Sequence, residues 1–389
     1  MTALAGAAHL LSDLTIVELS DTMAGAFCGR MLAFHGARVI RVLDRAQPPR
    51  TSTESRPLGP LSATDLHTDV LKERRWLDLS DAADRIQLAE LIAGADAFIT
   101  DLEAPRLARL DLVPEDLRRR HAHLICTHIT PFGRSGPKAG WRADDINIQA
   151  FAGFCSMVGS PAREPLMAPY ALAFTQGGLH AASATVAAVL TRALSGAGGI
   201  VDVAIGEVLG AIIRMYSLVC RFYDIPPKRA GRRAPGSAGR YPCSLFPCKD
   251  GYIVLTSRSG KQWRQILAMM GNPAWAEAPR YQDSYGIAME YPDEVDALVI
   301  PWMMQRTRAE LMALGLEHGV PLGQVRRIDE VLADPQFDYR RFFQDVLVGK
   351  LRVKVSSAPA QIVEHGNGQR LDRNPPAATV GKEGQVRVA

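Results

Sequence analysis

The chain has 389 residues, 47% of them hydrophobic, and a formal net charge of +4. This length accommodates two or three globular domains, and the small net charge gives no indication of nucleic-acid binding. The apolar stretch at 170–190 is interrupted by glycine and polar residues, so we expect a buried helix there and no membrane partner.

The first half of the chain alternates strand-like and helix-like segments. Hydrophobic periodicity predicts a strand at 14–19, a helix at 24–34 and a second strand at 37–43. A strand, a helix and a strand in this order form a parallel unit with a right-handed crossover. Further strands are predicted at 76–79, 97–100 and 124–130, with a helix at 82–92 capped by Asp81. This pattern is typical of a doubly wound α/β sheet with Rossmann-like layers.

The second half begins with a long helix predicted at 176–194. A strand at 198–205 and an apolar helix through Cys220 follow it. Residues 225–240 are rich in proline, glycine and arginine, which is typical of an ordered linker or loop. Beyond them, a strand at 251–256 and a helix at 262–270 indicate a smaller unit.

The six cysteines are scattered along the chain, and only Cys243 and Cys248 lie close together in sequence. No Cys or His pair at zinc-ligand spacing accompanies them, so the sequence predicts no metal site. Scattered cysteines in a long chain are typical of reduced thiols, and the N-terminus lacks the basic segment of a signal peptide. We therefore expect a cytoplasmic protein.

The segment EPLMAPYALAFTQGG at 164–178 is the most informative motif. It resembles the signature of the family III CoA-transferases (CaiB/BaiF type) and the related α-methylacyl-CoA racemases. Other segments resemble the same family in the family's order: residues 14–42, 95–111, 145–149, 199–202, 241–251, 319–325 and 332–336. Because these segments span nearly the whole chain, the resemblance concerns the complete fold.

The resemblance implies an α/β protein with a Rossmann-like large domain and a small α/β domain. The large domain would comprise residues 1–224 and 345–389, and the small domain residues 241–344. Residues 225–240 would form a linker arm between them. Two chains would interlock as rings in a dimer.

Phe174 is the residue that departs from the family's chemistry. The family carries an acidic residue at this place, ahead of the glycine-rich helix start, and uses it as the nucleophile. A carboxylate forms mixed anhydrides and thioesters with an acyl-CoA, whereas a phenyl ring forms neither. By resemblance, this chain is therefore a member that lacks the catalytic Asp.

Asp144 stands where the racemases of the family carry a histidine. Its neighbour Asp145 would raise the pKa of Asp144 through like-charge repulsion, which makes Asp144 a candidate acid or base. The alternative is a helix cap with a solvent-facing neighbour.

The resemblance also implies residues that contact coenzyme A, bound as an acyl-CoA cosubstrate. Its phosphates require guanidinium groups and backbone donors at helix starts. The predicted contacts are Arg45, Arg109 and Arg142 for the phosphates, Met23 and Ala24 for the pantetheine, and Leu77, Asp78, Leu79, Ser80, Asp101 and Leu102 for the adenosine. The alternative for each arginine is a solvated surface charge. A basic cluster at Arg229, Arg232, Arg233 and Arg240 is either an anion site or a solubilising arm.

Three functions remain open at this point. The first is a subunit of a family III CoA-transferase that binds acyl-CoA and a carboxylic acid acceptor but supplies no nucleophile, paired with a paralogous subunit or with itself. The second is a lyase, dehydratase or isomerase acting on an acyl-CoA, in which one base and backbone donors to the enolate suffice. The third is a non-catalytic CoA-ester binding protein. Apolar residues near Phe174 in sequence suggest a bulky apolar or aromatic acyl group: Phe151, Met157, Met167 and Tyr170.

Overall fold

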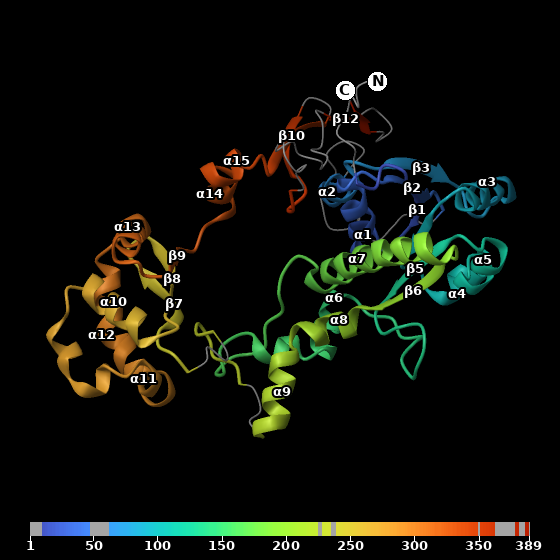
Figure 1. The fold of residues 1–389 in the computed structure, drawn as a ribbon. Helices are drawn as coiled ribbons and strands as arrows, with labels where there is room; N and C mark the ends of the chain where they lie inside the picture. Colours follow the sequence, from blue (N-terminus) through green and yellow to red (C-terminus); the bar gives the residue numbers. More distant parts are fainter. Residues whose placement is uncertain are drawn as a thin grey trace. The chain divides into compact units, whose positions relative to one another are not determined.

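The computed structural model describes residues 10–46, 62–224, 228–234, 239–348, 351–361, 378–380 and 386–388. The chain divides into two compact units, each with its own core (Figure 1). Unit 1 comprises residues 1–152, 168–212 and 332–389, and unit 2 comprises residues 153–167 and 213–331. This grouping differs from the expected domain boundaries, because residues 153–167, 213–224 and the expected arm at 225–240 group with unit 2 and residues 332–344 with unit 1.

Hydrogen bonds explain why residues 153–167 group with the segment expected to be a linker. The guanidinium of Arg229 donates to the carbonyl oxygens of Ser160 (3.1 Å) and Arg163 (2.8 Å). The backbone N–H of Gly231 donates to the carbonyl of Gly159. Parts of the expected linker, residues 225–227 and 235–238, lie outside the described residues.

A six-stranded parallel sheet forms the centre of unit 1. Its strands are β1 (Thr15–Leu19), β2 (Arg38–Asp44), β3 (Glu73–Leu77), β4 (Ala97–Thr100), β5 (Ile125–Thr130) and β6 (Gly199–Ala204). Their order is β3-β2-β1-β4-β5-β6, and all neighbours pair in parallel. The predicted doubly wound sheet is confirmed, although β3 begins earlier than expected because Glu73 already pairs with β2. The strand order reverses between β1 and β4, and ligands of such sheets bind at the carboxyl ends of the strands beside that reversal.

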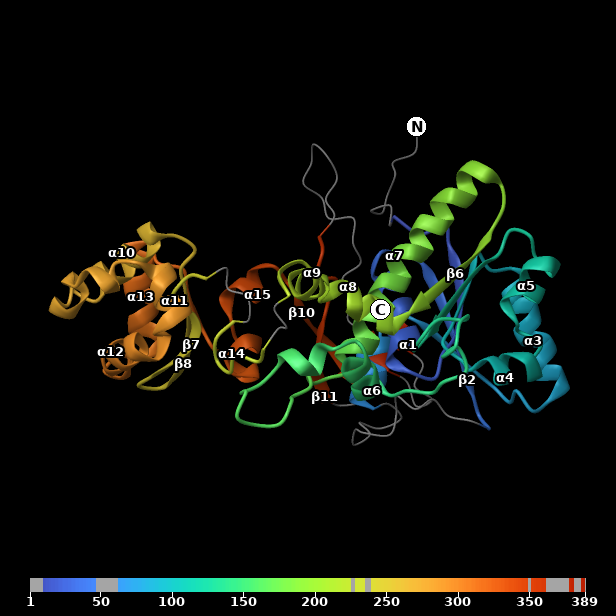
Figure 2. The same cartoon turned by 90° about the horizontal axis from the view of Figure 1, so that it is seen from below.

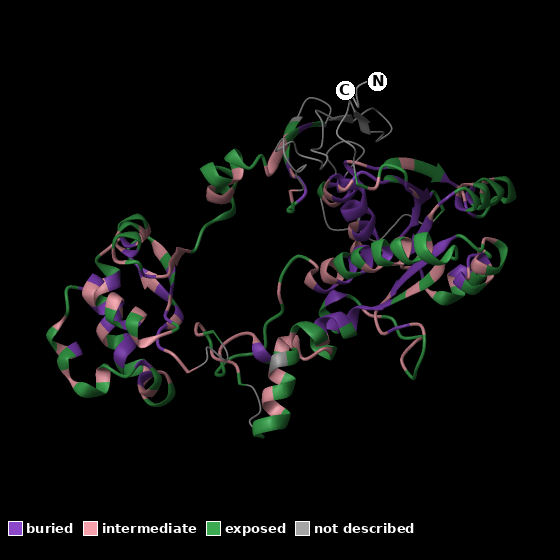
Figure 3. Ribbon diagram, viewed as in Figure 1, coloured by how far each residue is buried: buried purple, intermediate pink, exposed green. Residues whose placement is uncertain are grey.

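Helices cover both faces of this sheet (Figure 2). One face packs against α1 (Met23–Phe34), α6 (Asp145–Phe151), α7 (Leu172–Ser195) and α8 (Ile205–Ile212). The other face packs against α3 (Ala82–Ala93), α4 (Ala104–Arg109) and α5 (Pro114–Arg120). Burial is concentrated in the strands of this sheet and in α1 (Figure 3). As predicted, Asp81 caps α3, accepting hydrogen bonds from the N–H groups of Ala83 and Asp84.

The remaining elements of unit 1 are α2 (Ala63–Asp69) and a second sheet. That sheet has the order β11-β10-β12-β13 and consists of β10 (Phe343–Val348), β11 (Leu351–Ser356), β12 (Ala378–Val380) and β13 (Val386–Val388). The short helix α15 (Pro335–Tyr339) precedes it in unit 1, and α14 (Ile328–Leu332) belongs to unit 2 up to residue 331. The buried Arg30 of α1 donates to the carbonyl of Ser356, which ties β11 to the first helix.

The apolar helix expected to run through Cys220 is two helices, α8 and α9 (Arg214–Tyr223). Residues Val208 and Leu209 of α8 are buried in the core of unit 1, whereas α9 groups with unit 2. Hydrophobic periodicity is continuous across both helices, so the sequence pattern alone did not reveal the break.

Unit 2 has a three-stranded antiparallel sheet and four longer helices after α9. The strands are β7 (Cys243–Cys248), β8 (Gly251–Thr256) and β9 (Leu322–Gln324), and the helices are α10 (Gly260–Met269), α11 (Ser284–Glu290), α12 (Pro292–Met304) and α13 (Arg308–His318). The predicted strand at 251–256 is confirmed, and the helix predicted at 262–270 begins two residues earlier. The indole of Trp263 is fully buried at the centre of this core.

The basic cluster has internal partners. The guanidinium groups of Arg232 and Arg233 both bind the buried carboxylate of Asp296 on α12, which also accepts a hydrogen bond from Tyr241 (2.8 Å). These arginines therefore attach the arm to α12.

Candidate functional site

Two helix N-termini converge at the carboxyl edge of the six-stranded sheet. Helix α1 follows β1 directly, and α7 crosses it so closely that a Cβ on Gly178 would lie 2.4 Å from the carbonyl oxygen of Ala24. A side chain at position 178 would therefore separate the helices. The contact brings Met23 and Ala24, the predicted pantetheine contacts, beside the glycine-rich start of α7.

Helix α7 begins after two consecutive left-handed residues, Tyr170 (φ 59°) and Ala171 (φ 52°). This backbone conformation costs about 1–2 kcal/mol for a residue that carries a Cβ. The fully buried Gln149 holds the turn: its side chain accepts from the N–H of Ala168 (2.8 Å) and donates to the Ala168 carbonyl (3.0 Å). The strained turn is thus fastened to α6.

Asp145 fixes the first turn of α7 from the same helix. Its carboxylate accepts the backbone N–H of Phe174 at 2.9 Å and the side-chain amide of Gln149 at 2.5 Å. A carboxylate at a helix N-terminus is stabilised by the free N–H groups and the helix dipole. The buried carboxylate beside position 174 is therefore committed to the backbone.

Asp144 is the exposed N-cap residue of α6, and its N–H donates to the side chain of Asn147 (3.0 Å). The cap alternative describes Asp144 correctly, but its neighbour Asp145 is buried and not solvent-facing. Asp145, and not the candidate Asp144, is the member of this pair that bonds the first turn of α7; an acid or base role for Asp144 stays a prediction. The spacing of Asp145 and Gln149, four residues apart on one helix face, was the available signal.

We expect Asp145→Asn to lower the free energy of unfolding by about 1–3 kcal/mol. One carboxylate oxygen becomes an NH₂ group, which faces either the N–H of Phe174 or the amide of Gln149, and both of these are donors. Urea unfolding measures the change. The matched control is Asp144→Asn, an exposed change on the adjacent residue, for which we expect a change near 0.5 kcal/mol or less. Equal losses for the two variants would contradict the arrangement.

A cavity of about 60 Å³ opens beside Phe174, and we call it the Phe174 cavity. It is lined by Asp21, Thr22, Asp101, Glu103, Ile129, Pro131, Trp141, Arg142, Ala143, Phe174 and Ile205. The ring of Phe174 is partly buried and packs against the main core of unit 1. The first turn of α7 thus presents a phenyl ring to this cavity.

A second cavity of about 260 Å³ adjoins the first, and we call it the His128 cavity. It is lined by Asp101, Leu102, Glu103, Ala104, Pro105, Leu107, Val113, Pro114, His128, Thr130, Pro131, Arg134, Ala139, Gly140, Trp141 and Arg142. Five of these residues also line the Phe174 cavity: Asp101, Glu103, Pro131, Trp141 and Arg142. The two cavities therefore share a wall. Burial lowers the pKa of His128, whose Nε2 lies 2.9 Å from the carbonyl of Leu102, so its imidazole is neutral at pH 7.

Asp101 caps the turn between β1 and α1. Its carboxylate accepts hydrogen bonds from the N–H groups of Asp21 (2.7 Å), Thr22 (3.1 Å) and Gly25 (3.0 Å) and from the Thr22 hydroxyl (2.6 Å). Desolvation raises the pKa of Asp101 to about 6, against the opposing effect of these hydrogen bonds. Gly25 is required here, since a Cβ would lie 2.9 Å from the Asp101 carboxylate and 2.5 Å from Ser20 Cβ. Asp101 therefore occupies the anion position at the start of α1.

The arginines of the site are paired with carboxylates. Arg142 Nη2 lies 2.5 Å from Glu103, with 74% of the arginine side chain exposed. Nη2 of Arg134 donates to both carboxylate oxygens of Glu115, at 2.6 and 2.7 Å. An incoming phosphate would compete with these carboxylates for the guanidinium groups.

The structure brings some of the predicted coenzyme A contacts together and leaves others apart. Asp101, Leu102 and Arg142 line the cavities, and Met23 and Ala24 follow Thr22 at their edge. The others lie elsewhere: Arg45 and Ser80 are exposed after β2 and β3, Leu77 and Leu79 are buried, Asp78 bonds Ser80, and Arg109 is exposed at the end of α4. Sequence reasoning missed Glu103, Trp141 and Arg134. All three follow strands β4 or β5, so the sheet topology was the signal that pointed to them.

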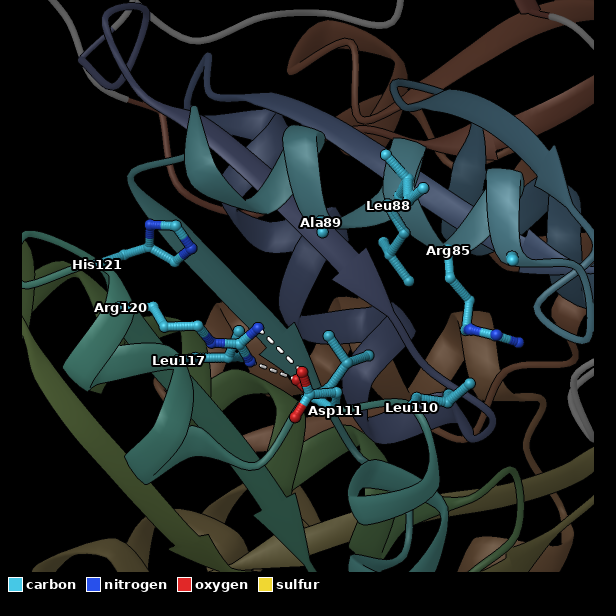
Figure 4. Close-up of a pocket in the computed structure, with 11 residues that line it drawn as sticks. Arg85, Leu88, Ala89, Leu110, Asp111, Leu117, Arg120 and His121 are labelled. Atoms are coloured by element: carbon cyan, nitrogen blue, oxygen red, sulfur yellow. Dashed lines mark hydrogen bonds and ion pairs between the residues drawn. The ribbon is translucent and has the colours of Figure 1, made fainter.

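A third cavity, of about 290 Å³, lies between α3 and α5 and holds none of the predicted site residues (Figure 4). Arg120 Nη1 lies 3.2 Å from Asp111 Oδ2 on its wall. None of its lining residues lies at the carboxyl end of a strand of the six-stranded sheet, so we do not assign the site there.

Within the described residues, no group of three or more His, Cys, Asp or Glu side chains is arranged to hold a metal ion. Across the same ranges, the helices are too short or too polar to cross a membrane. All six cysteines are free thiols.

The sequence model of CoA-transferase family III matches residues 11–379. The chain belongs to CoA-transferase family III. A succinate–glutarate CoA-transferase of Agrobacterium fabrum is 29% identical over 85% of this chain and 83% of its own length. Subunit BbsE of the succinyl-CoA:(R)-benzylsuccinate CoA-transferase of Thauera aromatica is 29% identical over 94% of this chain and 90% of its own.

Structural similarity agrees with the family III assignment. A CaiB/BaiF family protein from Brucella suis superposes with a TM-score of 0.83 and 26% identity, covering 97% of both chains. The predicted family, the α/β fold and the class of CoA-transferase are thereby confirmed.

Proposed function

We propose that this chain is a subunit of a family III CoA-transferase that binds a CoA thioester without supplying the carboxylate nucleophile. The observation that carries the proposal is the phenyl ring of Phe174 in the first turn of α7, on the wall of the Phe174 cavity. A phenyl ring forms no covalent intermediate with an acyl group.

The surrounding carboxylates support this proposal, because each already has a structural partner. Asp145 binds the backbone of α7, Asp101 binds the backbone of α1, and Asp21 pairs with Arg106 at 2.6 Å. A nucleophile needs a free oxygen directed at the thioester carbon. The missing carboxylate would come from a related chain. The relative BbsE is named as a subunit of its CoA-transferase.

We place coenzyme A along the two cavities, with its thioester end beside Phe174. Arg134, Arg142 and Trp141 on the wall of the His128 cavity suit the nucleotide part, and the start of α1 adjoins this cavity. This path fits five of the predicted contacts: Met23, Ala24, Asp101, Leu102 and Arg142. The nucleotide would have to extend beyond the cavities to reach the others, Arg45, Arg109 and residues 77–80. The acceptor would be a carboxylic acid, and two chains would interlock as a dimer.

Expression alone and together with a paralogous family III chain from the same source tests this proposal. The purified lone chain should bind acyl-CoA but transfer no CoA to a carboxylic acid, and the pair should be active. Full CoA transfer by the lone chain would refute the proposal. Deuterium exchange at the acyl α-carbon by the lone chain would favour the lyase or isomerase reading, and binding without turnover in every combination would favour a CoA-ester binding protein.

A further inference from the structure

The charge and the volume of the Phe174 cavity bear on which acyl group it can hold. We infer that this cavity takes a short, uncharged acyl chain and discriminates against acyl chains that end in a carboxylate. The inference rests on the proposed function, because it assumes that the thioester end of the acyl-CoA lies beside Phe174.

The charge of the lining opposes an anionic acyl group. Three carboxylates line the cavity, those of Asp21, Asp101 and Glu103, and among the described lining residues Arg142 is the one cation. Like charges brought together across a binding interface cost several kcal/mol. A terminal carboxylate in this cavity would therefore meet more repulsion than attraction.

The guanidinium groups nearby are already engaged. Arg142 lies 2.5 Å from Glu103 and is largely exposed, so solvent screens its charge. Arg106 is partly buried behind Asp21 and bridges that carboxylate (2.6 Å) to Asp44 (2.9 Å). Binding a distal carboxylate would require breaking one of these ion pairs.

The remaining wall is apolar and narrow. Ile129 and Ile205 are buried, and Ala143, Pro131 and Phe174 complete the surface. A volume of about 60 Å³ corresponds to roughly four or five water-sized groups, since a single water needs about 10–15 Å³ on this measure. The cavity therefore fits a chain of about four carbon atoms, shorter than the bulky or aromatic acyl group expected from the sequence.

Butyryl-CoA and succinyl-CoA form a matched pair of probes, because their acyl chains have equal carbon numbers and differ in the terminal carboxylate. Calorimetric titration of the full chain should show butyryl-CoA binding at least about tenfold more tightly than succinyl-CoA. Free CoA serves as the reference for the nucleotide part. Titrations at two salt concentrations should show a smaller ratio at the higher one, because salt screens partly exposed charges.

Glu103→Gln tests the cause of the discrimination. Removing this carboxylate frees Arg142 and takes one negative charge from the cavity wall. A gain at the nucleotide part is common to both acyl-CoAs and to free CoA, so the expected result is a several-fold rise in the affinity for succinyl-CoA relative to butyryl-CoA. The matched control is Glu115→Gln, which breaks the Arg134 pair outside the Phe174 cavity and should leave the ratio unaltered. Circular dichroism verifies that both variants are folded.

The outcomes separate this inference from the function on which it rests. Equal binding of the two acyl-CoAs, or tighter binding of succinyl-CoA, overturns the inference and leaves the CoA-binding subunit intact. An unchanged ratio in Glu103→Gln also overturns it. Absence of binding by both acyl-CoAs and by free CoA overturns the proposed function as well.

Discussion

Arg41→Met is expected to lower the free energy of unfolding by about 3–5 kcal/mol. Arg41 is fully buried on β2, where its guanidinium binds Asp69 and Thr68 (3.1 Å) and lies 3.5 Å from Glu18. Methionine matches its length but leaves the buried carboxylates undercompensated. Lys72, 2.6 Å from Glu18, and Arg74, 3.5 Å from Asp69, remain as cations of this network. Chemical denaturation followed by circular dichroism measures the loss.

The matched control is Arg38→Met, three residues earlier on the same strand. Arg38 pairs with Glu73 at 2.7 Å, but both side chains are about half exposed, so we expect a loss below about 1 kcal/mol. Equal losses for the two arginines would contradict the buried network.

The pH dependence of the free energy of unfolding should also change in Arg41→Met. Burial opposes ionisation of Asp69, but attraction from Arg41, Lys72 and Arg74 outweighs it and lowers the pKa of Asp69. A carboxyl group with a lowered pKa contributes stability above its ordinary pKa near 4 and loses it as the pH falls. We therefore expect the gap between Arg41→Met and the unaltered chain to narrow below pH 4.

Phe174→Asp is expected to allow an enzyme-bound adduct to form from an acyl-CoA. The new carboxylate would stand in the first turn of α7, beside the Phe174 cavity, and attack the carbonyl carbon of a thioester bound there. The C–S bond would break, CoA would leave as a thiolate, and a mixed anhydride would remain on the enzyme. Desolvation and the nearby Asp145 carboxylate would raise its pKa, so we expect weak turnover. Mass spectrometry after incubation with an acyl-CoA panel reports the adduct, and hydroxylamine should release it.

The matched control is Phe174→Asn, because the side chain of Asn has the shape of Asp but carries an amide in place of the carboxylate. It should bind acyl-CoA equally well and form no adduct. If the folded Asp variant binds CoA but yields neither adduct nor turnover, the cavity has diverged beyond its nucleophile, and the subunit proposal loses its main support. An adduct in the Asn variant would show that another residue reacts.

The sequence by itself determined the family and the layer architecture. Strands β1, β4 and β5 and helices α1 and α3 lie within two residues of their expected bounds. Buried strands and amphipathic helices each have a characteristic pattern of hydrophobic residues, which is visible in the sequence. The departure of Phe174 from the family's acidic residue was also predicted from the sequence alone, since Phe174 lies within the contiguous motif at 164–178.

Only the tertiary structure decided which polar groups are available for chemistry. Asp144 and Asp145 are equivalent neighbours in sequence, yet one caps α6 in solvent and the other is buried against the first turn of α7. The ion pairs that engage Arg142 and Arg232 join residues about 40 and 60 positions apart. Long-range pairing of this kind leaves no periodic trace, because any carboxylate of the chain is a chemically equal partner until the fold brings one of them within hydrogen-bond distance.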